Sequence, residues 1–272
     1  MEIGNTGWLR YRHLYAKLVK RMTFIPLTFI GIDVSSSRRP YSLAALDNNL
    51  HLVALSQGED LEILGYCAGQ SSALAVISAP SCPNQGFMTH PEVRQRYNPP
   101  PSPNHWTNLR QAEYELYLKG IRIQRTPASG ETIPGWMKRG FSLYQSLGNL
   151  EYHAYPEENA ARQWLESRAE AVFQTLIGVE LFEAGTLEGR LQRQLILHEQ
   201  DMPVPDPMNF FEEVTRHRLL HSILPVEKLY SGPELNAIAV AYVGWLAVHE
   251  PEKIIRLGDP GEGQITLPAG NA

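Results

Sequence analysis

The clearest pattern of hydrophobic and polar positions is an apolar run over residues 27–34. In an extended chain, one face would carry Leu27, Phe29, Gly31 and Asp33, and the other Thr28, Ile30, Ile32 and Val34. Apolar residues on both faces are typical of a strand that is covered on both sides of a sheet. Asp33 closes this run, and burying a charge there is costly unless it lies at the strand end with a partner or a metal ion. Asp33 is therefore either a functional carboxylate or a cap for the serine-rich turn that follows it.

Shorter patterns predict the elements around this strand. The turn sequence Asp47-Asn48-Asn49 lies between two short apolar runs, which is typical of a β-hairpin. A short helix and a second fully apolar strand follow. The expected elements are the hairpin strands 41–46 and 51–55, the helix 59–67 and the strand 73–77.

Residues 80–105 are rich in proline, which excludes a long helix or a central strand. A long segment of this kind is usually a lid, a binding loop or a covering arm. The chain has 272 residues, and we expect one domain over residues 22–272 with this loop as an insertion. Residues 1–21, which precede Met22, are expected to be an extension outside the fold.

The second half of the chain is mainly helical in pattern. The last long helix begins at Ser231, which forms a capping-box sequence with Glu234, and its apolar positions predict burial almost all round. The expected helices are 106–119, 134–147, 157–176, a further helical segment reaching 199 after a break near Gly178 and Gly185, and 210–224. An edge strand is expected over 264–268.

A strand, a hairpin, a helix and a strand, followed by helices and a buried late helix, fit a three-layer α/β fold of the ribonuclease-H-like type. This fold has a mixed central sheet, here with helical insertions. In such a fold, acidic groups from the strand ends and from the late helix converge to hold Mg²⁺ or Mn²⁺. Asp33 lies where the first of these groups is expected.

Short motifs occur in a particular order along the chain. They are Gly31-Ile32-Asp33, Ile77-Ser78-Ala79-Pro80, Arg110-Gln111-Ala112-Glu113 with Gly120-Ile121, Trp136-Met137 with Gly140-Phe141, residues 187–195, Glu234-Leu235-Asn236-Ala237, and Gly258-Asp259-Pro260 with Glu262-Gly263. In these motifs the chain resembles the DUF429 family, whose members are predicted to be ribonuclease-H-like nucleases. The resemblance covers roughly residues 28–268.

The resemblance implies a Mg²⁺- or Mn²⁺-dependent nuclease with Asp33 as the acid of the first strand and a metal ligand. The second strand end of the family often carries an Asp, and Ser78 stands there in this chain. The late helix usually carries an Asp where this chain has Asn236, which can offer one neutral oxygen. The site would therefore carry fewer charges than a pair of divalent metals requires.

The Glu-x-Tyr-Pro motif of the family has two placements here. Its order along the chain favours Glu166, whereas its spelling favours His153-Ala154-Tyr155-Pro156, with Glu151 just upstream. We take Glu166 as the second metal ligand, although the helical pattern of 157–176 argues against a strand there. The other placement stays open.

Two functions are consistent with these residues. In the first, a nuclease hydrolyses phosphodiester bonds with Asp33, Glu166 and Asn236 as catalytic residues. Its substrate would be bound by Ser78, Arg190 and Arg193. In the second, a catalytically lapsed relative binds a nucleotide, a nucleic acid or a protein. The two arginines could equally form a solvated, salt-bridged helix face, and Asn236 could simply hydrogen-bond a strand end.

Composition narrows these alternatives only slightly. The net charge is −5, whereas nucleic-acid-binding proteins are more often basic, so any phosphate-binding surface must be local. Cys67 and Cys82 are too few and too far apart for a metal knuckle or a disulfide framework, and we expect free thiols. The sequence has no apolar run long enough for a membrane span and no signal-peptide pattern, so we expect no membrane partner and a cytoplasmic protein.

Overall fold

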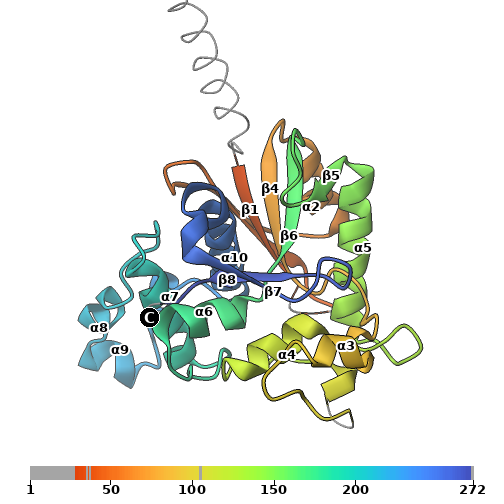
Figure 1. The fold of residues 1–272 in the computed structure, drawn as a ribbon. Coiled ribbons are helices and arrows are strands. Elements are labelled where there is room, and N and C mark those ends of the chain that lie inside the picture. Colours follow the sequence, from red (N-terminus) through yellow and green to blue (C-terminus); the bar gives the residue numbers. More distant parts are fainter. Residues whose placement is uncertain (1–27, 35, 37, 104–105, 271–272) are drawn as a thin grey trace, which may run out of the picture.

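The computed structural model describes residues 28–34, 36, 38–103 and 106–270. The expected extension, residues 1–21, lies outside the described residues. The described residues form a mixed sheet of eight strands with helices on both faces (Figure 1). The strands are β1 (Thr28–Asp33), β2 (Tyr41–Leu46), β3 (Leu52–Gly58), β4 (Ala73–Ser78), β5 (Tyr152–Ala154), β6 (Arg162–Glu166), β7 (Ile254–Leu257) and β8 (Ile265–Pro268).

The strand order is β3-β2-β1-β4-β6-β8-β7, with β5 also paired to β6. β1 runs antiparallel to β2 and parallel to β4, and β4 runs parallel to β6. The three parallel strands β1, β4 and β6 therefore have their carboxyl ends at one edge of the sheet. This is the edge at which α/β proteins commonly bind their ligands.

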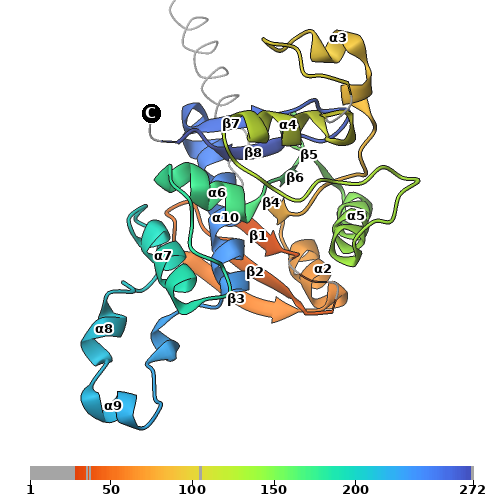
Figure 2. The same ribbon diagram turned by 90° about the horizontal axis from the view of Figure 1, so that it is seen from below.

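Helices cover both faces of the sheet and make a three-layer α/β arrangement (Figures 1 and 2). The core on one face joins β1, β4 and β6 to α6, α7 and α10, and the core on the other face joins the sheet to α2 and α5. The helices are α2 (Asp60–Ala68), α3 (Pro91–Arg94), α4 (Gln111–Leu118), α5 (Gly135–Asn149), α6 (Ala169–Ile177), α7 (Leu187–His198), α8 (Asn209–Glu213), α9 (Arg216–Leu220) and α10 (Gly232–His249).

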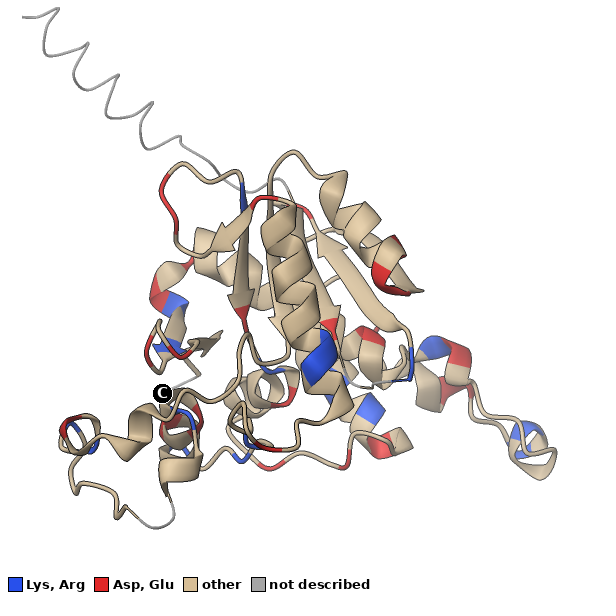
Figure 3. Cartoon of the chain, turned by 90° about the vertical axis from the view of Figure 1, so that its right-hand side faces the viewer, with Lys and Arg blue, Asp and Glu red and all other residues tan. Residues whose placement is uncertain are grey.

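The faces of β1 agree with the alternation in the sequence. Phe29 packs in the α10 core, whereas Ile30 and Ile32 pack in the α2 and α5 core. Charged residues are sparse along the strands and helices in the middle of the molecule and lie mostly toward their ends and at the periphery (Figure 3). The buried first strand and the hairpin β2–β3 are confirmed.

The helix α10 approaches β1 closely because Gly31 has no side chain. A Cβ atom at this position would overlap the carbonyl oxygen of Ala237 and would lie 2.6 Å from the amide nitrogen of Ala241. The predicted capping box is confirmed, since the Ser231 side chain and the Glu234 side chain each bond the other's backbone. The cap and the close approach together fix the first turns of α10 over the end of β1.

The prediction of one helix over 157–176 is wrong. Residues Arg162–Glu166 form β6, which inserts between β4 and β8, and a helix begins only at Ala169. Alternate side chains of β6 enter opposite cores, with Leu165 on the α10 side and Trp164 on the α5 side. Burial between two strands overrides the helix propensity of this segment.

Three further expectations differ from the structure. The helix expected over 210–224 is divided into α8 and α9, which lie away from the sheet (Figure 2). The helix expected over 106–119 begins as an α-helix only at Gln111, after a 3₁₀ turn at Trp106–Asn108. The strand expected at the edge, β8, pairs with both β6 and β7, so β7 forms the edge instead.

The proline-rich segment is a loop with short helical turns, as the sequence predicts. Cys67 is buried and Cys82 partly buried, and both are free thiols. Within the described part of the chain, no helix is both long enough and apolar enough to cross a membrane.

Candidate functional site

Three of the predicted site residues meet at the carboxyl ends of β1 and β4. Asp33 and Ser78 are the last residues of these strands and are direct neighbours in the parallel register. Asn236, in the second turn of α10, donates a hydrogen bond from Nδ2 to Oδ1 of Asp33 over 3.2 Å. The side-chain oxygen of Ser78 accepts a hydrogen bond from the backbone of Ala169, the first residue of α6.

These residues line a cavity of about 370 Å³. This volume lies at the small end of the range for ligand pockets, roughly 300–1,000 Å³. The charged, polar and aromatic side chains in its lining come from six parts of the chain. They are Asp33, Ser78, Arg122, Gln124, Trp136, Arg168, Glu170 and Asn236.

Glu166 does not join this cavity. It lies one position short of Ser78 in the register, because Ile77 is its partner on β4. The preceding residue, Leu165, enters the α10 core, so Glu166 points to the α5 side of the sheet, opposite Asp33. Glu166 lines a different cavity.

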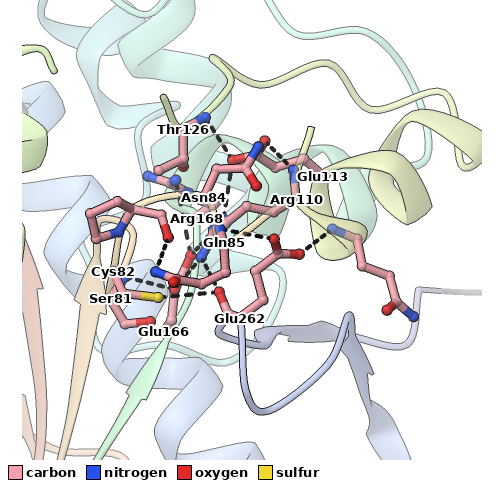
Figure 4. A network of polar contacts seen from close by, with 12 residues as sticks. Ser81, Cys82, Asn84, Gln85, Arg110, Glu113, Thr126, Glu166, Arg168 and Glu262 are labelled. Carbon is pink, nitrogen blue, oxygen red and sulfur yellow. Dashed lines mark hydrogen bonds and ion pairs between the residues drawn. The ribbon is translucent and has the colours of Figure 1, made fainter. Parts of the chain in front are cut away.

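The carboxylate of Glu166 is bound instead by the buried guanidinium of Arg110 (Figure 4). Arg110 Nη1 donates to Oε2 over 3.1 Å, and Nη2 donates to Oε1. The backbone nitrogen of Ser81 adds a hydrogen bond of 2.8 Å. Burial by itself raises the pKa of Glu166, but the charge and hydrogen bonds of Arg110 outweigh burial and hold the pKa below its ordinary value.

The same buried network anchors the proline-rich loop. Glu262, in the turn between β7 and β8, accepts hydrogen bonds from the backbone nitrogens of Gln85, Phe87 and Gln111. Arg110 also donates to the backbone oxygen of Glu262 over 3.2 Å. Glu166 and Glu262 therefore tie this loop and the start of α4 to the sheet (Figure 4). Glu166 therefore has a structural role in this network.

The two arginines expected to bind phosphate have other partners. Arg190 donates to the backbone oxygens of Tyr230 and Leu229. Arg193 is fully buried and donates two hydrogen bonds of 2.8 Å from Nη2 to the two carboxylate oxygens of Glu170. Neither arginine lines the cavity. Arg193 instead neutralises Glu170, and Glu170 does line the cavity.

The cavity contains a cation that the sequence reasoning did not single out. Arg168 is only 6% exposed, and among the described residues none accepts a hydrogen bond from its Nε or its Nη2. Its guanidinium carbon lies 5.4 Å from the ring centroid of Trp136. Its ion-pair partner is Glu166, with Nη2 3.9 Å from Oε1. Burial lowers the pKa of Arg168 from its ordinary value, against the opposing attraction of Glu166.

A pair of divalent metals does not fit this donor set. Asp33 is paired with an amide, Glu170 is bound through both oxygens by Arg193, and Arg168 brings a positive charge to the same cavity. Two Mg²⁺ ions carry four positive charges and need several carboxylates to balance them. Among the described residues, no group of three or more His, Cys, Asp or Glu side chains is placed to hold a metal ion.

The other placement of the Glu-x-Tyr-Pro motif is also distant from Asp33 in the structure. Glu151 and His153 line a separate cavity at the amino-terminal end of β6. Of the predicted residues, the structure thus brings together Asp33, Ser78 and Asn236. It adds Arg168, Trp136, Arg122 and Glu170. The sequence offered a signal only for Trp136, through its motif with Met137.

No family model matches the sequence, no curated protein matches it significantly, and no solved structure matches its fold significantly.

Proposed function

We propose that this chain is a ribonuclease-H-like protein, related to the DUF429 proteins, that binds a nucleotide or a nucleic acid in the cavity at Asp33 without two-metal cleavage. The strand order from β3 to β6, with β1 and β2 antiparallel and β1, β4 and β6 parallel, supports the fold assignment. The function rests on one observation above all. The register directs Glu166 away from Asp33, and Arg110 neutralises it.

The charges in the cavity favour an anionic ligand over a metal cluster. Glu170 is neutralised by Arg193, which leaves the carboxylate of Asp33 facing the cations Arg168 and Arg122. Asn236 holds Asp33 through a hydrogen bond and does not add charge. A ligand phosphate would meet more positive than negative charge in this cavity.

A second candidate is a Mg²⁺- or Mn²⁺-dependent nuclease. The observation that favours it is the presence of two carboxylates, Asp33 and Glu170, in one cavity with the amide of Asn236. Oxygen groups of this kind are the ligands that both metals prefer. Against this candidate, Glu170 already has the buried Arg193 as its partner.

The two candidates are separated by measuring binding and cleavage on the same preparations. Labelled single-stranded RNA, single-stranded DNA and an RNA–DNA hybrid are titrated with the full chain and followed by fluorescence anisotropy. The same substrates are then incubated with Mg²⁺ or Mn²⁺ and resolved on denaturing gels. We expect binding without cleavage.

Asp33→Ala serves as the matched variant in the cleavage assay. Metal-dependent cleavage by the wild type that is lost in Asp33→Ala would establish the nuclease and overturn the binding-only proposal. Adenosine monophosphate is titrated separately by isothermal titration calorimetry. If neither it nor the oligonucleotides bind to the wild type, the proposed binding of a nucleotide or a nucleic acid is wrong.

A further inference from the structure

We propose that Arg168 is the phosphate-binding residue of this cavity and that the ligand is a single nucleotide unit, either free or unpaired within a strand. This inference deepens the proposed function and rests on it. Arg168 follows β6 by two residues and immediately precedes α6. It is the N-cap residue of that helix.

The first support is that the guanidinium of Arg168 is buried with unused donors. With 6% exposure, Nε and Nη2 have little access to water, and no described residue accepts from either. A buried donor without a partner is costly, and one on a charged group costs more than a neutral one. A phosphate oxygen would satisfy these donors.

The second support is that Glu166 cannot serve as a full partner. The 3.9 Å separation of Arg168 Nη2 and Glu166 Oε1 is too long for a hydrogen bond. Both oxygens of Glu166 already accept hydrogen bonds from Arg110, and one also accepts from Ser81. Glu166 is thus already neutralised by Arg110 and leaves the donors of Arg168 available.

The third support is the position of this arginine beside other groups suited to a phosphate. The first turn of α6 begins at the next residue, and a helix N-terminus favours negative charge. Trp136 lies against the guanidinium and limits its orientations. Arg122, which is exposed at the rim, provides a second cation.

The cavity volume limits the ligand. A space of about 370 Å³ accommodates a mononucleotide-sized group but not a duplex, whose bases are held inside the helix. The ligand is therefore a free nucleoside monophosphate or a nucleotide in a single strand. These two sources share the phosphate chemistry and are distinguished by experiment.

A purely structural role for Arg168 is the main alternative. In that case the arginine only offsets the negative charge of Glu166 and Glu113, both of which are buried. This role would make Arg168 important for stability and irrelevant for binding. The test must therefore measure ligand affinity on variants shown to be folded.

The experiment uses isothermal titration calorimetry on the full chain with three probes, namely inorganic phosphate, adenosine monophosphate and a short single-stranded oligonucleotide. The variants are Arg168→Met, which is close in length but uncharged, and Arg168→Lys, which keeps the charge but loses the planar fork. Arg125→Met is the matched control, because Arg125 lies on the same segment as Arg122 but is exposed and pairs with Glu131. Circular dichroism and thermal unfolding establish that each variant is folded.

We expect adenosine monophosphate or the oligonucleotide to bind the wild type and Arg125→Met equally. Arg168→Met should bind at least about tenfold more weakly, as expected for the loss of a charge-assisted hydrogen bond. Arg168→Lys should fall between them, and higher salt should weaken binding to the wild type. Preference for the monophosphate would identify a free nucleotide, and preference for the oligonucleotide would identify a strand.

Unchanged affinity in a folded Arg168→Met variant would overturn the role of Arg168 and leave the proposed function standing. If Arg168→Met does not fold, the affinity of Arg168→Lys provides the test. An affinity equal to that of the wild type would overturn the phosphate-binding role of Arg168. No binding of any probe to the wild type would overturn both proposals together.

Discussion

Asp33 and Glu166 end two parallel strands of the same sheet but point to opposite faces of it. Asp33 contacts Asn236 of α10, whereas Glu166 is bound by Arg110 on the side of α5. A shift of one residue in the register of β6 would place a carboxylate on the same face as Asp33. The register therefore decides whether the strand ends form an acidic site.

Replacement of Arg110 by methionine should strongly destabilise the fold. The buried carboxylate of Glu166 would lose its bidentate partner, and breaking a buried ion pair from one side typically costs about 3–5 kcal/mol. Urea unfolding measures the free energy of unfolding of each variant. Arg125→Met, which breaks an exposed pair, is the matched control and should have little effect. An Arg110→Met variant as stable as wild type would contradict the importance of this pair.

The stability of the protein should fall in acid, partly because of Glu166. Its pKa in the folded protein is held below the ordinary value, so the carboxylate contributes stability that is complete above the unfolded-state pKa of about 4.3. Below that pH the unfolded chain binds a proton that the folded chain does not, and stability decreases by up to about 1.4 kcal/mol per pH unit. Urea unfolding between about pH 7 and pH 3 measures this slope. Glu166→Gln should show a smaller slope, and an identical slope would exclude Glu166 as a source.

Substitution of Gly31 by alanine should disrupt the packing of α10 on β1. The new methyl group would overlap the carbonyl oxygen of Ala237 and approach the Ala241 nitrogen to 2.6 Å, so the helix would have to move. We expect a loss of at least about 3 kcal/mol in the unfolding free energy. Gly65→Ala, in α2, is the control, because its methyl group would meet no atom within 4 Å. It should stabilise the protein by about 0.5–1 kcal/mol, and equal effects at both sites would contradict the close approach.

Replacement of Asn236 by aspartate should create repulsion with Asp33. The 3.2 Å hydrogen bond is lost and two carboxylates face each other, so we expect a loss of about 1–3 kcal/mol at neutral pH. Because proximity raises the pKa of such a pair above its unfolded value, protonation should restore part of this stability at lower pH. Asn236→Ala loses only the hydrogen bond and should show no such recovery. Chemical unfolding at about pH 7 and pH 5 gives the free energy of unfolding of both variants. The same change with pH in both would argue against the contact between residue 236 and Asp33.

The sequence located the part of the site formed by β1 and α10 better than the part near β6. Alternation along β1 and the capping box of α10 are local signals, and they correctly placed Asp33 and the start of the late helix. Glu166 was chosen by its order along the chain, and the strand that carries it was interpreted as a helix. Pro156 and a turn at Asn159 do precede β6, but the strand is short and its conformation depends on pairing with β4.

Arg168 shows why the remaining part of the site could not be read from the chain. Nothing in the local sequence distinguishes it from Arg190 or Arg193, which were the arginines expected to meet phosphate. The three differ only in what the fold places beside them. Arg190 and Arg193 meet backbone oxygens and Glu170, whereas Arg168 is buried against Trp136 with donors unused.

The sequence by itself determined the buried strand that ends in Asp33, the hairpin after it and the capped helix that crosses it, because each depends on neighbours within one element. Only the tertiary structure decided which charges meet at the strand ends. Strand register selects the face of each side chain, and the burial of Arg110 and Arg193 selects which carboxylates are neutralised. These choices depend on residues distant in the chain, so no local pattern encodes them.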